Sequence, residues 1–168
     1  NMIPETSKSV ASLIEITHLK QTERALQKSE EMLKQTEQMT KVGGWEYNVK
    51  DKTVSWTDEV YRIYGVDKKE YDPSDIKKDI SFYGPDDQKK IEQALQNTIE
   101  KGKPYDLEAE FYSARKEHRW VRTIGKPVFK SGEVIKIRGN IMDITQQKET
   151  EIKARENESL ITSLMDNL

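Results

Sequence analysis

The stretch Gly139-Asn140-Ile141-Met142-Asp143-Ile144-Thr145 runs directly into Gln146-Gln147-Lys148-Glu149-Thr150-Glu151. Its first half has the β-branched pattern of a strand, and its second half has the charged pattern of a solvated helix. No glycine or proline separates the two halves. The sequence therefore predicts a last strand that passes directly into a helix, so that a movement of the strand is transmitted along that helix.

A degenerate copy of this junction lies near the start of the chain. Residues 14–23 align with residues 142–151 and share Ile, Thr, Lys, Thr and Glu, at a spacing of one domain plus one connector. This repeat suggests a piece of a tandem array. We expect residues 1–16 to be the end of a preceding module or a remnant of cloning, 17–41 a connector helix, 42–145 the domain, and 146–168 a signalling helix leading to a next module.

Composition limits the function classes. The 168 residues are 34% hydrophobic and 35% charged, with a net charge of −2 and no cysteine. This charge gives no basis for binding nucleic acid, and no apolar run approaches the ~18 residues that span a bilayer. Without cysteine, disulfides and thiolate chemistry are excluded. We expect a cytoplasmic location, no nucleic-acid partner and no membrane contact by this chain.

The predicted connector helix, residues 17–41, contains no Gly or Pro, and Gly43-Gly44 is expected to end it. Leu19, Leu26 and Leu33 recur every seven residues, but the second apolar position of each heptad is polar. The helix is therefore either a solvated connector or one half of a homodimeric coiled coil.

The remaining pattern predicts an α+β fold. Short strands are expected at 45–49 and 53–56, and longer ones at 105–111, 118–129 and 134–144. Between them lie a helix that Thr57 caps and Gly65 ends, a turn opened by Asp72-Pro73-Ser74, and a helix that begins at Pro85. Two strands alone are unstable, so all five are expected to form one antiparallel sheet with short helices on one face.

This order and several short motifs resemble a PAS domain of the kind found in sensor kinases and cyclic-dinucleotide signalling proteins. The resemblance covers about residues 42–145. Its pieces are Gly44-Trp45-Glu46-Tyr47, Trp56 to Gly65, Pro85-Asp86-Asp87, Arg119-Trp120-Val121-Arg122, Gly139 and Asp143-Ile144-Thr145. It implies a dimeric sensor or relay module, linked to neighbouring PAS and histidine kinase domains. Alternatives are a ligand-free spacer or interaction module, and the input domain of a diguanylate cyclase.

The resemblance also implies an internal ligand pocket, but the sequence names no cofactor. Cysteinyl-flavin chemistry would need a cysteine, and haem would need a histidine on the helix from Pro85, which has none. A non-covalent flavin, an organic acid or a fatty ligand remain open, as does no ligand at all. The residues expected either to line a small-molecule pocket or simply to fill the core are Ile63, Tyr64, Ile91, Leu95, Phe111 and Ile141.

The strand-to-helix junction is the better candidate for function. Thr145 is predicted to cap the exit helix through its hydroxyl, and the resemblance implies that Asp143 pairs with Arg119 or Arg122. Trp120 is expected either to pack where sheet and helix meet or to be an ordinary sheet aromatic. The two histidines, His18 and His118, lie in charged surroundings, and no phosphate-binding loop is present. We therefore predict no catalytic residue, no metal site and no enzymatic activity in this chain.

Overall fold

The computed structural model describes residues 5–166, and the chain divides into two units at Met39/Thr40. The described part of the first unit is helix α1 (Glu5–Thr40) except for its last residue. This helix begins well before the predicted start at Thr17, because residues 5–16 contain no Gly or Pro. The β-branched residues near Ile14 and Ile16, which suggested the exit of a strand, are helical here, since propensity is a weak determinant. Residues 1–4 and 167–168 of the predicted terminal segments lie outside the described residues.

The end of α1 differs from the prediction. Lys41, the residue after the helix, adopts a left-handed φ of 53° and ends it, whereas Gly43 and Gly44 lie within strand β1 (Val42–Asn48). Gly43 is needed there for close packing, because a Cβ at this position would lie 2.6 Å from Cγ2 of Val60. The glycine pair therefore belongs to the sheet rather than to the helix end.

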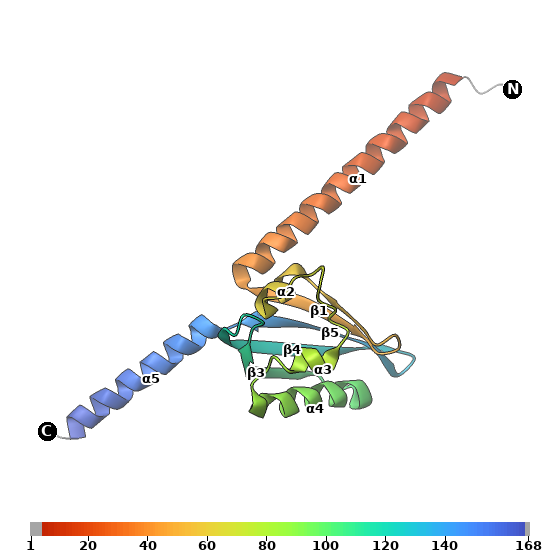
Figure 1. Ribbon diagram of the computed structural model, residues 1–168. Helices are drawn as coiled ribbons and strands as arrows, with labels where there is room; N and C mark the ends of the chain where they lie inside the picture. Colours follow the sequence, from red (N-terminus) through yellow and green to blue (C-terminus); the bar gives the residue numbers. More distant parts are fainter. Residues whose placement is uncertain (1–4, 167–168) are drawn as a thin grey trace. The chain divides into compact units, whose positions relative to one another are not determined.

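The second unit is built on a five-stranded antiparallel sheet, as predicted. The strands lie in the order β2-β1-β5-β4-β3, so the first and last strands of the domain, β1 and β5, are neighbours in its centre (Figure 1). Besides β1, the strands are β2 (Thr53–Trp56), β3 (Tyr105–Tyr112), β4 (His118–Lys130) and β5 (Glu133–Asp143).

Two helices pack against this sheet, α2 (Asp58–Tyr64) on β1 and α4 (Pro85–Lys101) on β3, β4 and β5 (Figure 1). A third helix, α3 (Ile76–Ile80), lies beside α4. Pro85 is in the first turn of α4 and Gly65 ends α2, both as predicted. Thr57 does not cap α2 through its side chain. Its hydroxyl accepts instead from the N–H of Gly44 at 3.1 Å, which ties α2 to β1.

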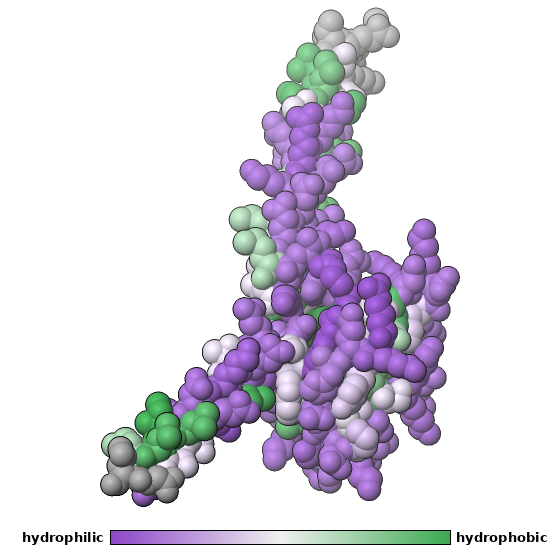
Figure 2. Space-filling view, turned by 60° about the vertical axis from the view of Figure 1, so that its left-hand side comes forward, coloured by the Kyte–Doolittle hydropathy of each residue, from purple (hydrophilic) through white to green (hydrophobic). Residues whose placement is uncertain are grey.

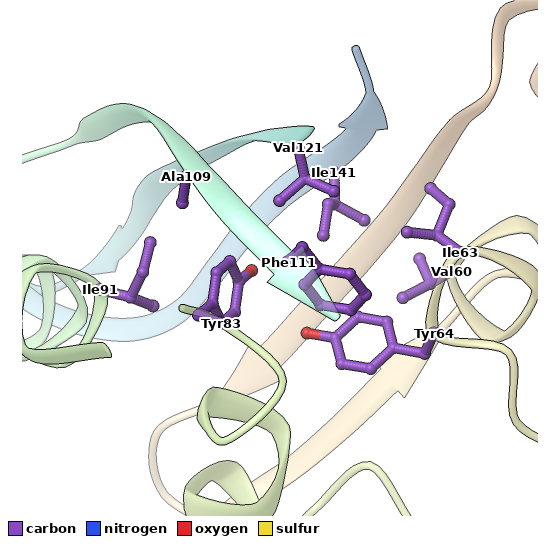
Figure 3. Close-up of a cluster of buried hydrophobic side chains, with 9 residues drawn as sticks. All are labelled: Val60, Ile63, Tyr64, Tyr83, Ile91, Ala109, Phe111, Val121 and Ile141. Atoms are coloured by element: carbon purple, nitrogen blue, oxygen red, sulfur yellow. The ribbon is translucent and has the colours of Figure 1, made fainter. Parts of the chain in front are cut away.

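The hydrophobic core fills the space between the helices and the sheet. Figure 3 shows apolar side chains from α2, the segment before α4, α4 itself and three strands converging on Phe111, which is fully buried. Phe111 makes edge contacts with Tyr64 and Tyr83, with ring centroids 4.8 and 5.4 Å apart. These contacts hold α2 and the start of α4 over the same part of β3.

The chain leaves the sheet through α5 (Thr145–Asp166), one residue after β5 ends. The order of elements is therefore the predicted one throughout, including the direct passage of the last strand into a helix. Within residues 5–166, no helix is both long and apolar enough to cross a membrane.

Candidate functional site: an aromatic cavity and the exit of the last strand

One row of residues crosses all five strands in register. Trp56 of β2 pairs with Trp45 of β1, which pairs with Gly139 of β5, Gly125 of β4 and finally Tyr105 of β3. Directly opposite residues of antiparallel strands point to the same face, so this row presents three aromatic side chains and two glycines toward the helices.

The two glycines make room for the rings beside them. A Cβ on Gly125 would lie 2.4 Å from Cε1 of Tyr105, and a Cβ on Gly139 would lie 2.5 Å from Cζ2 of Trp45. The rings of Trp45 and Tyr105 therefore extend toward each other over the glycines in the middle of the sheet, with nearly parallel planes (19° apart) and centroids 6.4 Å apart. Together they form an aromatic floor for the space under the helices.

Above this floor lies a cavity of about 80 Å³. Four of the predicted pocket residues line it, namely Tyr64, Ile91, Leu95 and Ile141. The other two, Ile63 and Phe111, are packed in the core cluster and are not part of the cavity wall. Residues that the sequence reasoning missed complete the wall: Trp45, Tyr47, Val54, Trp56, Val60, Ile76, Asp79, Ile80, Tyr83, Tyr105 and Thr123.

Asp79 is the charged member of this wall. It is only 8% exposed, and the hydroxyl of Tyr71 donates to its Oδ1 at 2.6 Å. Burial raises the pKa of Asp79 to about 7, although the hydrogen bond from Tyr71 opposes this shift. A carboxyl group near its titration point thus lies against an otherwise aromatic and aliphatic space.

Tyrosine hydroxyls add the remaining polar groups of the cavity. The hydroxyls of Tyr64 and Tyr83 point toward each other (Figure 3), and burial raises the pKa of Tyr83 to about 12. Both phenols are therefore neutral at physiological pH and act as hydrogen-bond donors and acceptors. Thr123 contributes a further hydroxyl from β4.

The cavity does not fit the flavin or haem cofactors that were considered from the sequence. Pockets for drug-sized ligands occupy roughly 300–1,000 Å³, far more than the space found here. Neither His18 nor His118 lines the cavity, so the wall offers no histidine that could hold haem iron. In the part of the chain that is described, no cluster of His, Cys, Asp or Glu could hold a metal ion.

The second site is the junction of β5 with α5. The Asp143 carboxylate Oδ1 accepts from both the backbone N–H and the hydroxyl of Thr145, at 3.0 and 2.6 Å. The oxygen of that hydroxyl in turn accepts from the backbone N–H of Trp120 at 3.0 Å. Thr145 therefore does not cap α5 as predicted. It bridges the end of β5 to β4, and Asp143 supplies the side-chain acceptor at the start of the helix.

The structure distinguishes between the two candidate partners of Asp143. Nη1 of Arg119 lies 3.6 Å from Oδ2 of Asp143, whereas Arg122 makes a two-bond pair with Asp106 at 2.7 and 2.6 Å. The reason is the strand register. Asp143 lies opposite Val121 in β4, so Arg119, two residues away, shares its face and Arg122, one residue away, does not.

Trp120 lies where the sheet meets α5, which is the first of its two predicted settings. Its carbonyl accepts from the N–H of Ile144 at 2.8 Å, and Nζ of Lys148 is 5.6 Å from its ring centroid. Lys148 also pairs with Glu108 of β3. The first turn of α5 is thus bound to both β4 and β3.

The entrance of the domain joins the same network. The backbone N–H of Asp143 donates to the carbonyl of Lys41 at 3.2 Å, and Val42 pairs with Met142 in the sheet. The residue directly after α1 and the residues that precede α5 are therefore directly hydrogen-bonded.

Comparison with known proteins agrees with this geometry. The family model described as the PAS fold matches residues 53–141, just over half of the chain. A crystal structure of a sensory box histidine kinase/response regulator from Burkholderia thailandensis superposes with a TM-score of 0.62 and 22% identity, covering 78% of this chain and 98% of that one. At this identity the likeness shows the fold.

Two relatives match by sequence. The sensor protein FixL of Bradyrhizobium diazoefficiens is 23% identical over 128 residues, which cover 76% of this chain and 25% of FixL. The probable diguanylate cyclase DgcE of Escherichia coli is 26% identical over 145 residues, covering 83% of this chain and 12% of DgcE. The chain thus spans a quarter or less of the length of these two relatives.

Proposed function

Since the chain belongs to the PAS fold family, we propose that it is the sensor and relay module of a cytoplasmic, multidomain signal-transduction protein whose output domain is a histidine kinase. In this proposal the module itself is not an enzyme. It receives a signal in its cavity and passes a conformational change to its neighbours through the flanking helices α1 and α5. The likeness to FixL supports the choice of output.

The observation that carries the proposal is the bonded junction between β5 and α5. Asp143 and Thr145 connect the first turn of the helix to β4 through a cluster of polar contacts that includes Trp120 and Arg119. A surface ion pair contributes only about 0–1 kcal/mol to stability, so the value of such a cluster lies in fixing the direction of the helix. A shift of β5 relative to β4 would then change how α5 leaves the sheet.

The position of β5 links this junction to the cavity. Ile141 lines the cavity, and Asp143 is two residues further along the same face of the same strand. Gly139, two residues before Ile141, makes room for the Trp45 ring of the aromatic floor. A ligand that displaces the rings of the floor would therefore press on the strand that holds the exit helix. This short path favours a sensing module over a ligand-free spacer with a filled core.

Exposed leucines on α1 support a homodimer. Leu19, Leu26 and Leu33 are 59%, 60% and 61% exposed and recur once per heptad. A heptad seam of this kind is buried when two helices pair. Figure 2 shows a second apolar area on the last turns of α5, made by Leu160, Ile161, Leu164 and Met165. We propose that both flanking helices pair with those of a second copy.

A second candidate output is favoured by one comparison. The match to DgcE covers more of this chain than the match to FixL. We therefore keep the input domain of a diguanylate cyclase as the alternative. The relay through α5 is the same in both proposals, because it depends on this chain and not on the identity of the output domain.

The relay is tested in the full-length protein that contains this chain. Asp143→Asn removes one charge and weakens the acceptor for Thr145, and we expect the output activity to lose its response to the input signal while the fold is retained. Asp106→Asn is the matched control, because it breaks another Asp–Arg pair of the same sheet, away from α5. An Asp143→Asn protein that responds as the wild type does would refute the relay.

A further inference from the structure

The cavity combines aromatic walls with a single buried carboxylate, and we propose that it binds a small organic ammonium cation. The ligand would be a protonated alkylamine or a quaternary ammonium, held by the aromatic rings and paired with Asp79. This inference rests on the proposed function in one respect only, namely that the module senses a ligand. It adds the chemical class of that ligand.

The size of the cavity limits the ligand to a few atoms. A cavity of about 150 Å³ accommodates benzene, and one water molecule accounts for about 30 Å³ in the liquid. The space of about 80 Å³ found here therefore suits a ligand of roughly three to five non-hydrogen atoms. Small alkylammonium ions fall in this range, and most metabolites with fused rings do not.

The walls have the composition of a cation site. Six of the fifteen lining residues are aromatic, so rings surround the space on several sides: Trp45, Tyr47, Trp56, Tyr64, Tyr83 and Tyr105. The face of an aromatic ring carries partial negative charge and attracts a cation within about 6 Å, with tryptophan the most effective. Because no Lys or Arg is part of the wall, it contains no positive charge that would favour an anion.

Asp79 supplies the counter-charge. The Tyr71 hydroxyl occupies its Oδ1, and this is the one side-chain hydrogen bond that stabilises its ionised form within residues 5–166. A buried carboxylate with so few donors is costly to ionise, which is also why the pKa of Asp79 lies near 7. An ammonium N–H, or the close approach of a quaternary ammonium, would supply a second and charged partner.

Binding of a cation is therefore coupled to loss of a proton. A protonated Asp79 must ionise before it can pair, so affinity should rise with pH and level off above about pH 7. Other groups act on this carboxyl: the nearby carboxylates of Asp72 and Asp75 raise its pKa, and Lys78 and the Tyr71 hydroxyl lower it. The phenols of Tyr64 and Tyr83 also face this charge.

The experiment compares two ligands of the same shape on the 168-residue chain. Isopropylammonium and 2-propanol have about the same number of non-hydrogen atoms, within the range set by the cavity, and differ in charge. Each is titrated at pH 8, with sodium chloride keeping the ionic strength constant, and binding is followed by tryptophan fluorescence, since Trp45 and Trp56 line the cavity. We expect the dissociation constant of the ammonium to be at least about tenfold lower, as for a hydrogen bond to a charged group. At pH 6 its affinity should be about tenfold weaker than at pH 8.

Two variants identify the charge responsible. Asp79→Asn should remove the preference for the ammonium, whereas Asp72→Asn, an exposed carboxylate outside the wall, should preserve it. The comparison of the two ligands on the wild type needs neither variant, so it stands even where Asp79→Asn folds poorly. Equal binding of both ligands, stronger binding of the alcohol, or no binding of the ammonium would overturn the inference. None of these results touches the relay through Asp143, which is measured separately in the output of the full-length protein.

Discussion

The most direct test of the cavity concerns the protonation of Asp79 and its effect on stability. The substitution Asp79→Asn keeps the size of the side chain and an oxygen that can accept from Tyr71, but it removes the titrating group. The structure buries Asp79 to 8% exposure, and burial raises its pKa from the ordinary value near 4 to about 7. In the unfolded chain, the pKa of Asp79 has its ordinary value near 4.

The sign of the effect is set by these two values. Between about pH 4 and pH 7 the folded protein holds a proton on Asp79 that the unfolded chain has already lost. The stabilisation from this proton is fully present below about pH 4 and is lost as pH rises through about 7. The free energy of unfolding should therefore fall with rising pH in this window, which is opposite to the usual behaviour of a salt-bridged Asp.

The size of the change in the free energy of unfolding follows from the size of the pKa shift of Asp79. Each pH unit in the window changes the free energy of unfolding by about 1.4 kcal/mol, so the loss between pH 5 and pH 8 is about 2.5 kcal/mol, nearly all of it below pH 7. Other titrating groups contribute equally to the wild type and the variant. The expected quantity is therefore the difference between the two proteins.

Urea denaturation monitored by circular dichroism at pH 5, 6, 7 and 8 measures this difference. We expect Asp79→Asn to gain about 2.5 kcal/mol relative to the wild type between pH 5 and pH 8. The control Asp72→Asn removes a nearby exposed carboxylate that raises the pKa of Asp79, so it should keep the fall in stability with rising pH and move it to slightly lower pH. Parallel curves for wild type and Asp79→Asn would show that Asp79 is ionised in the folded protein with an ordinary pKa, and would refute a pKa raised by burial.

Two further predictions concern the aromatic floor and the dimer. Gly125→Ala places a Cβ 2.4 Å from the Tyr105 ring, so we expect a loss of about 1–3 kcal/mol in the free energy of unfolding. Adding Tyr105→Leu to this variant should recover part of the loss. Equal stability of Gly125→Ala and wild type would contradict the tight packing. Leu26→Lys places a charge in the proposed seam of α1, so native mass spectrometry should find the wild type as a dimer and the variant shifted toward monomer. A wild type that is monomeric at all concentrations would remove the basis for a dimer formed through this helix.

Several features of the fold are local in the sequence, and the sequence was sufficient for them. Pro85 with Asp86 and Asp87 after it predicted the start of α4, because these residues suit the first turn of a helix whatever surrounds it. The alternation of β3 and the passage of β5 into α5 were likewise visible in short stretches. The start of α1 could not be predicted in this way. The β-branched residues near Ile14 suit either a strand or a helix, and in the structure they are helical.

Most residues of the cavity wall could not be predicted from the sequence. Asp79 lies in a short helix rich in charge, where the sequence pattern favours a solvated residue, and only the packing of α3 beside Tyr71 buries it. Trp45 and Tyr105 are far apart in sequence and meet only because two glycines of the strands between them leave room for the rings. Neither glycine carries a local signal for this function.

The order of helices and strands was already contained in the sequence, because each element depends on the spacing of apolar residues, on caps and on turns within a few neighbours. Which side chains meet was decided only in the folded molecule. Arg119 and not Arg122 faces Asp143 because the register places Val121 opposite Asp143, and a shift of one residue would exchange the two arginines. That register is fixed by hydrogen bonds and packing between strands that are distant in the sequence, so the function of these residues depends on the folded sheet.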